Sequence, residues 1–231
     1  MKPHLTSLRR NAFTLIEMLV VVSVIGLLLA ISAPRIFSLL RSNELGTQGD
    51  TLRNWLSLAQ QKAVSTNAPV EVRFYKFADT DEAQTEPEFR AAQYYQFDRD
   101  GEVKPASQIL LIKSPILLSK DPKLSNILDK GKNNSFGILS SGEKLFKSLF
   151  GSRQLTGIVE YSSFRFRPDG STDLDTRPSS DPDKPAYTWY LTLIQEGTSS
   201  KNSSGGKDDI PKNFVCLQID QFNGSIREFR P

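Results

Sequence analysis

Residues 9–18 read RRNAFTLIEM: a pair of arginines and a small residue lead into a phenylalanine that opens a long apolar run. From Phe13 to Ala33 the run spans 21 residues, and its polar side chains are Thr14, Glu17, Ser23 and Ser32. A helix of this length measures about 31 Å, which is enough to cross the hydrocarbon core of a bilayer. The run therefore predicts a helix whose first half, 13–33, lies in a membrane.

Glu17 is the one charged side chain within this run. A charge at membrane depth costs about 2.5–3.5 kcal/mol on insertion scales, so it calls for a partner. A close ion pair at an effective dielectric of about 20 gains roughly 4 kcal/mol, which offsets that cost. Alternatively, Glu17 reaches the lipid headgroups from the first turns of an ordinary anchor.

The segment resembles the N-terminal signature of type IV prepilins and type II secretion pseudopilins. The resemblance implies that a prepilin peptidase/methyltransferase cuts between Ala12 and Phe13 and then methylates the new α-amino group of Phe13. It implies that Glu17 meets the α-amino group of a neighbouring subunit and sets the axial register of a filament. Other pilins or pseudopilins and inner-membrane lipid are the further partners implied. That family usually has glycine before the cut, and Ala12 is also small.

A cleaved secretory signal is the competing interpretation of the same segment. Lys2, Arg9 and Arg10 would form its basic start, and residues 31–33 would be its cleavage site. The apolar run is longer than the roughly 7–15 residues of such signals. Pro34 would also follow the cut bond, a poor position for that protease. Both facts favour an anchor that is retained.

The formal net charge of +3 lies entirely in residues 1–12, which hold three basic residues and no acid. Their removal leaves 26 basic and 26 acidic residues, a neutral chain that gives no argument for nucleic-acid binding. Positive residues beside a membrane span stay on the cytoplasmic side. We therefore expect a single-pass protein of the bacterial inner membrane with a cytoplasmic N-terminus and a periplasmic head.

Residues that carry catalysis or bind metals are scarce. The single histidine, His4, lies in the leader, and the single cysteine, Cys216, lies in an apolar stretch typical of a buried thiol. Without the leader, histidine triads and histidine zinc sites are excluded, as is a disulfide within the chain. No phosphate-binding or dinucleotide-binding glycine motif occurs. We expect no enzymatic activity, no catalytic residue, no cofactor and no metal.

Five aspartates crowd one stretch of the chain: Asp169, Asp173, Asp175, Asp181 and Asp183. A calcium loop of the EF-hand type needs ligands at alternating positions around a central glycine. Here Gly170 directly follows the first aspartate, and prolines stiffen the rest. The expected structure is a solvated loop.

Helical periodicity continues beyond Pro34, which is expected to kink the helix because it has no N–H to donate. The helix should end near Asn67, since the residue before Pro69 disfavours helical dihedrals. We expect one helix of about 13–66 whose second half, 34–66, is amphipathic. Its apolar stripe follows spacings of three and four: Leu45, Gly49, Leu52, Leu56, Ala59 and Ala63.

The remainder, 67–231, reads as a β-rich head. Predicted strands are 70–74, 94–98, 109–112, 158–167, 187–195, 214–220 and 225–229. Turn signals occur at 99–101, 168–170 and 223–224; a short helix is predicted over 142–150, and loops over 78–88, 169–184 and 197–212. The predicted fold is α+β and pilin-like, with the long N-terminal helix packed on an antiparallel sheet.

Later motifs narrow the resemblance. Residues 52–70, from Leu52-Arg53-Asn54-Trp55-Leu56 to Asn67-Ala68-Pro69-Val70, are similar to the helix end of the minor pseudopilin H and FimT-like group. Residues 164–170 resemble its strand-and-turn element and residues 223–227 its closing hairpin. The segment of about 85–150 has no counterpart in shorter members, so we interpret it as an insert. The chain's size and this insert resemble the large pilin-like proteins of Verrucomicrobia.

FimT-like proteins are linked to DNA uptake through C-terminal basic residues, so the resemblance leaves this function open. The candidate DNA-binding residues are Arg165, Arg167, Arg227 and Arg230, which hairpin pairing would bring near one another, beside Phe164, Phe166 and Phe229. Alternating arginine and phenylalanine is also typical of a strand with one wet face. A single-pass membrane protein that never assembles is the third alternative.

Overall fold

A computed structural model of the chain describes residues 14–77, 86–98, 100–129, 136–139, 159–175, 188–196, 211 and 213–231, without the side chains of 31–41 and 139. The chain divides into two compact units, Met1–Asn43 and Glu44–Pro231. The first holds the start of the long helix, and the second holds the rest of that helix together with the sheet.

The helix α1 runs from Leu15 to Thr66, close to the predicted 13–66. Thr14 caps its start, because the Glu17 N–H donates to the Thr14 carbonyl (3.1 Å) and lies 3.3 Å from its Oγ1. The predicted end is confirmed: Asn67 takes a positive φ of 49° directly after the helix. The kink at Pro34 remains a prediction.

Two backbone bonds close the C-terminal end of α1. The Asn67 N–H donates to the Val64 carbonyl and the Ala68 N–H to the Ala63 carbonyl, each at 3.3 Å. This pair of bonds is the Schellman motif, which satisfies carbonyls that the ended helix leaves free. Asparagine tolerates the left-handed conformation that the motif requires.

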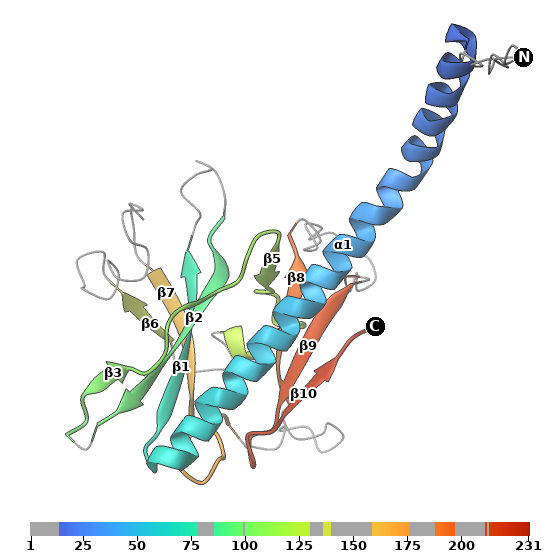
Figure 1. The fold of residues 1–231 in the computed structure, drawn as a ribbon. Helices are drawn as coiled ribbons and strands as arrows, with labels where there is room; N and C mark the ends of the chain where they lie inside the picture. The colour runs from blue at the N-terminus through green and yellow to red at the C-terminus, as the bar shows by residue number, and fades with distance from the viewer. Residues whose placement is uncertain are drawn as a thin grey trace, which may run out of the picture. The chain divides into compact units, whose positions relative to one another are not determined.

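The described strands form one antiparallel sheet in the order β10-β9-β8-β5-β2-β1-β7-β6, with β3 and β4 also paired to β2 (Figure 1). Their bounds are β1 Val70–Phe77, β2 Glu88–Phe97, β3 Val103–Pro105, β4 Leu110–Leu111, β5 Ile116–Leu118, β6 Phe136–Leu139, β7 Val159–Phe166, β8 Trp189–Gln195, β9 Phe214–Ile219 and β10 Ile226–Phe229. A 3₁₀ turn, η1 (Asn126–Leu128), lies between β5 and β6 in the chain. The predicted α+β class is confirmed.

The strands predicted at 70–74, 109–112, 158–167, 187–195, 214–220 and 225–229 are present as β1, β4, β7, β8, β9 and β10. The strand predicted at 94–98 begins earlier, at Glu88, in what was predicted to be a loop. Its residues Ala91 and Ala92 are both fully buried, so both faces of β2 are covered there and no alternation marks it. The short helix predicted at 142–150 lies outside the described residues.

Three short strands were not predicted: β3, β5 and β6. Each has three or four residues, too few to show a period of two, and each exists because a longer strand lies beside it. Together with β2, β4 and η1, these strands come from the segment of about 85–150. That segment therefore includes β2, which pairs with β1 in the middle of the sheet.

The amphipathic stripe of α1 is confirmed as the centre of the core. Leu45, Leu52, Leu56, Ala59 and Ala63 are each at most 1% exposed. They pack with alternate residues of the strands, such as Val70, Val72 and Phe74 of β1. A smaller cluster of Tyr75, Ala91, Tyr95 and Val159 covers the other face of β1 and β2. The head therefore has a two-sided sheet with α1 on one face (Figure 1).

Two predicted turns are confirmed by glycines at positive φ. Gly170 (φ 86°) follows β7, and Gly224 (φ 65°) lies between β9 and β10. The turns meet, because a Cβ built on Gly224 would lie 2.2 Å from the Gly170 carbonyl oxygen. Gln60 of α1 donates from Nε2 to the carbonyls of Gly170 (2.9 Å) and Asn223 (2.7 Å), which fastens both turns to the helix.

Candidate assembly helix and head surfaces

The first half of α1 presents apolar side chains on every side. All twelve large apolar residues described between Leu15 and Leu29 are at least 47% exposed, and Leu15 reaches 85%. A helix that is apolar all round is normally buried in a membrane or among other helices. Among the residues that the structure describes, no helical stretch meets the length and hydropathy required to cross a bilayer.

The polar side chains of this half differ in how they are satisfied. Thr14 caps the helix, and the Ser23 hydroxyl donates to the Leu19 carbonyl at 2.8 Å. Glu17 is exposed, and no described residue donates a hydrogen bond to its carboxylate. Its carboxylate is thus available to a group from outside the described chain. Ala12 and Phe13, the predicted cleavage and methylation residues, lie outside the described residues.

The four candidate DNA-binding arginines fall into two separate groups. Arg165 lies on β7 and Arg167 directly after it, whereas Arg227 lies on β10 and Arg230 directly after it. β10 is one edge strand of the sheet, and β7 is next to the opposite edge. No hairpin joins the two pairs, because β10 pairs with β9, and β7 with β1 and β6. The turns that follow β7 and β9 do meet, since the Thr172 N–H donates to the Gln221 carbonyl at 3.0 Å.

Arg165 is positioned by residues that the sequence pattern did not reveal. Its guanidinium lies 4.6 Å above the ring of Phe97, and its Nε is 3.9 Å from Glu71 Oε2. The backbone N–H of Arg165 donates to Asp173 Oδ1 at 2.7 Å. Half of the Arg165 side chain remains exposed, as does Arg167 two residues further on the same face.

Arg230 is held by acids. Its Nη2 lies 2.9 Å from Asp50 Oδ1 on α1, and its Nε bonds to Glu228. The hydrogen bond to Glu228, and to a smaller extent that to Asp50, raises the pKa of Arg230. A Cβ on Gly46 would lie 2.9 Å from Arg230 Nη1, so the glycine leaves room for the guanidinium. The arrangement ties the end of the chain to the helix.

The aspartates of the predicted solvated loop build turns. Asp169 accepts bonds from the N–H (2.9 Å) and hydroxyl (2.6 Å) of Ser171, which lower the pKa of Asp169. The Asp175 carbonyl accepts a bond from Trp189 Nε1 at 2.9 Å. Asp181 and Asp183 lie outside the described residues. In the described part of the chain, no group of three or more His, Cys, Asp or Glu residues is arranged to hold a metal ion.

A buried polar cluster on the outer face of the sheet was not predicted. Arg73 of β1 lies between the rings of Tyr95 (4.4 Å) and Tyr161 (4.8 Å), and its Nε lies 2.9 Å from Glu71 Oε1. The hydroxyls of Tyr75 and Tyr95 are 2.7 Å apart. The strand was predicted at 70–74, but the rings that cover Arg73 come from β2 and β7, which pair with β1 on its two sides.

Comparison with known proteins adds a family match at the N-terminus. Residues 7–33 match the family described as the prokaryotic N-terminal methylation motif. No curated protein is similar enough in sequence to be matched. The match covers Ala12, Phe13 and Glu17, the residues that carried the resemblance.

Two solved structures are similar in overall form. One is the minor pseudopilin EpsH of the Vibrio cholerae type 2 secretion system, with 11% identity, a TM-score of 0.40, and 81% of this chain and 98% of that chain covered. The other is the type IV minor pilin FimU of Pseudomonas aeruginosa, with 12% identity, a TM-score of 0.38, and 82% and 93% covered.

The prokaryotic N-terminal methylation motif thus lies at the start of the long helix α1. The later part of this helix packs on an antiparallel sheet, which is the α+β arrangement that the sequence predicted.

Proposed function

We propose that this chain is a minor pilin or pseudopilin subunit of a type II secretion or type IV pilus-like filament. A prepilin peptidase would cut it between Ala12 and Phe13, with 13–33 held in the inner membrane and the head in the periplasm. The observation that carries the proposal is the all-round exposure of apolar side chains from Leu15 to Leu29, within the matched motif. Such a surface requires a lipid or helical environment.

In a filament, neighbouring helices would cover this surface by side-chain packing, which is the main source of helix association in apolar surroundings. Glu17 would meet the α-amino group of a neighbouring Phe13, since its carboxylate has no donor among the described residues. Roughly 4 kcal/mol of attraction at an effective dielectric of about 20 is close to the cost of burying the charge. A subunit in the wrong register would leave that cost uncompensated, so the pair selects one register.

The experiment that tests processing is N-terminal sequencing of the membrane-bound protein by mass spectrometry. A chain that begins at N-methyl-Phe13 is the expected result. A chain that begins at Pro34 would identify a secretory signal and end the proposal.

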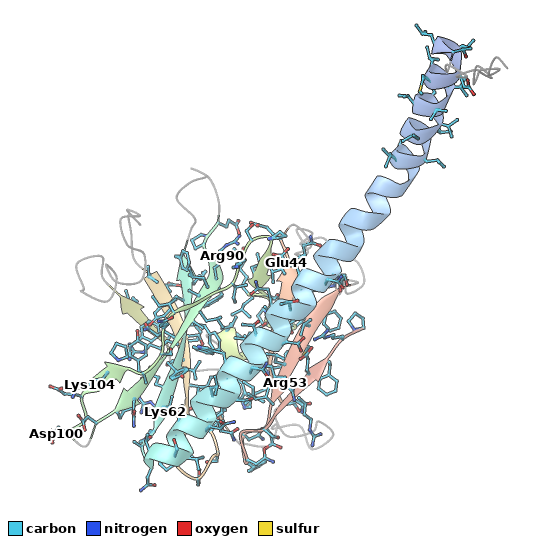
Figure 2. The ribbon with its side chains drawn as sticks, viewed as in Figure 1. Glu44, Arg53, Lys62, Arg90, Asp100 and Lys104 are labelled. Atoms are coloured by element: carbon cyan, nitrogen blue, oxygen red, sulfur yellow. The ribbon has the colours of Figure 1, made fainter. Side chains whose placement is uncertain are left out.

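Assembly is tested by crosslinking in cells that make the full set of filament proteins. Glu17→Ala should reduce crosslinks to other pilins at least tenfold, because the register-setting charge is gone. Asp100→Ala, an exposed acid in the β2–β3 turn, is the matched control and should crosslink like the wild type (Figure 2). Unchanged crosslinks in Glu17→Ala would favour a single-pass protein that does not assemble.

DNA binding is a second candidate function, supported by the exposed pair Arg165 and Arg167 beside Phe97. An aromatic ring under an arginine is a common element of sites that bind single-stranded nucleic acid. Gel-shift titration of the full chain in detergent across salt would show binding that weakens as salt rises. Arg165→Ala with Arg167→Ala should lower the salt slope, and Arg53→Ala on the exposed side of α1 serves as control. Salt-independent or absent retention would dismiss this function.

A further inference from the structure

The sheet narrows to one pair of residues between β2 and β5. In the described chain Phe89 opposite Leu118 is the single registered pair between these strands. By contrast, β1 pairs with β2 from Val70 to Phe77. The rest of that edge of β2 pairs with β3 and β4. The head therefore consists of two half-sheets, β10-β9-β8-β5 and β2-β1-β7-β6, that meet at what we call the seam, the Phe89–Leu118 pair.

Charged residues flank the seam on both sides of Phe89. Lys120 follows β5, and its Nζ lies 3.0 Å from Glu88 Oε1 and 2.7 Å from Glu86 Oε2. On the other side of Phe89, Arg90 Nη2 lies 2.6 Å from Oε1 of Glu196, the residue after β8. Both sets of ion pairs join the two half-sheets at the seam, where a single residue pair is registered between β2 and β5.

The segment 112–120 is the connector between the half-sheets at this place. It bonds to β2 through the Ile112 N–H and the Arg90 carbonyl (2.8 Å). It bonds to β8 through the Ser119 N–H and the Thr192 carbonyl (2.8 Å). Its attachment to β2 thus depends on few backbone bonds, on the Glu88–Lys120 ion pair, and on the packing of its buried apolar side chains against Phe89.

Other elements hold each half-sheet without using the seam. α1 contacts the first through Gly49, where an added Cβ would lie 2.6 Å from Val215, and the second through Trp55, whose ring is 5.1 Å from that of Tyr94. η1 also contacts both, since Asn126 Oδ1 accepts from the Tyr190 N–H and the Ile127 carbonyl accepts from the Ser162 hydroxyl. Separation at the seam therefore leaves the contacts of α1 and η1 in place.

We propose that the seam is sensitive to charge screening: the connector 112–120 separates from β2 more often when the Glu88–Lys120 and Arg90–Glu196 pairs are screened or removed, while α1 and η1 still hold both half-sheets. Local openings of this kind have lower free energies than global unfolding where backbone pairing is sparse. Lys120 and Glu196 are each 40% exposed, so dissolved ions reach these pairs. Raising the ionic strength should therefore weaken these pairs and make opening of the seam more frequent.

Amide hydrogen exchange of the full chain in a non-ionic detergent tests the proposal. Raising NaCl from about 0.05 to about 1 M shortens the screening length from over 10 Å to about 3 Å. The amide exchange rate in 112–120 should then rise about threefold to tenfold, which matches the free energy that part-exposed ion pairs contribute. The exchange rate in β1 should stay unchanged. Lys120→Met should reproduce the rise at low salt and reduce the response to added salt.

Lys104→Met is the matched control, because it removes an ion pair with Asp98 (2.8 Å) at the β2–β3 tip, away from Arg90 (Figure 2). It should leave exchange in 112–120 unchanged. Glu196→Gln tests the other pair. It should raise exchange in 112–120 further than Lys120→Met does, because it leaves the guanidinium of Arg90, which is only 10% exposed, without its carboxylate partner. The proposal is overturned if the exchange rate in 112–120 responds neither to salt nor to Lys120→Met, or if the exchange rate in β1 rises by the same factor. N-terminal processing is unaffected in either case.

Discussion

Arg230, the penultimate residue of the chain, lies 2.9 Å from Asp50 on the helix α1, and the two are 180 residues apart in sequence. The ion pair fixes the end of β10 over Gly46, at the part of α1 where the head begins. It gives this C-terminal arginine a contact with the helix that the sequence pattern did not reveal.

Removal of this ion pair should loosen the chain end without unfolding the head. Arg230→Ala is expected to lower the free energy of unfolding by less than about 1 kcal/mol, because exposed ion pairs contribute little. Exchange of amides in 226–229 should increase. Arg227→Ala, which removes an exposed arginine of the same strand, should leave that exchange unchanged. A loss of several kcal/mol in the free energy of unfolding of Arg230→Ala would contradict the view that the Arg230–Asp50 ion pair is exposed and weak.

The buried stripe of α1 should dominate the stability of the head. Leu56 is 0% exposed, so Leu56→Ala should cost about 2–5 kcal/mol through lost burial and a cavity. Leu58, two residues on, is 54% exposed, and Leu58→Ala should change stability by less than about 0.5 kcal/mol. Chemical denaturation of the full chain in detergent measures both. Equal effects would mean that α1 does not face the sheet as described.

The contact between two turns should make one glycine far less replaceable than another. Gly224 and Gly101 both have positive φ, but a Cβ would meet the Gly170 carbonyl oxygen at 2.2 Å in the first case and nothing within 4 Å in the second. Gly101→Ala should therefore cost about 1 kcal/mol from backbone strain alone. Gly224→Ala should cost clearly more, because the turns and Gln60 must separate. Thermal unfolding of both variants decides this, and equal melting temperatures would refute the contact.

The buried tyrosine pair should make the head sensitive to alkali. Burial raises the pKa of Tyr75 well above its ordinary value. A tyrosine ionises in the unfolded chain near pH 10 but stays neutral in the fold, so its contribution is complete below pH 10 and falls as pH rises further. Tyr75→Phe should weaken this alkaline loss of stability.

At neutral pH the same variant should cost about 0.5–1.5 kcal/mol, because its hydroxyl lies 2.7 Å from that of Tyr95. Denaturant midpoints from pH 7 to 11 compare it with the wild type. Parallel curves would show that Tyr75 ionises equally in the folded and unfolded states. Burial also raises the pKa of Tyr190 on β8, which is only half-buried, so Tyr190→Phe is the comparison and should weaken the alkaline loss less than Tyr75→Phe does.

Most of the fold follows from local patterns. The helix, its end at Asn67 and six of the strands could be predicted because their residues carry periodicity, a proline boundary or turn glycines. β2 was predicted only in part, since Ala91 and Ala92 are buried on both faces and show no alternation. The short strands β3, β5 and β6 have no pattern of their own and depend on their neighbours.

The N-terminal methylation motif could be recognised from the sequence, because the signature around Ala12, Phe13 and Glu17 is contiguous and needs no folding to be seen. The sequence by itself also determined the buried face of α1, since helical spacing places Leu45 to Ala63 on one side. The tertiary structure alone decided that Arg165 and Arg230 belong to different surfaces, and that charges bracket the seam at Phe89. Those relationships depend on which strands pair, and pairing between residues far apart in the chain is set by the packing of the whole core.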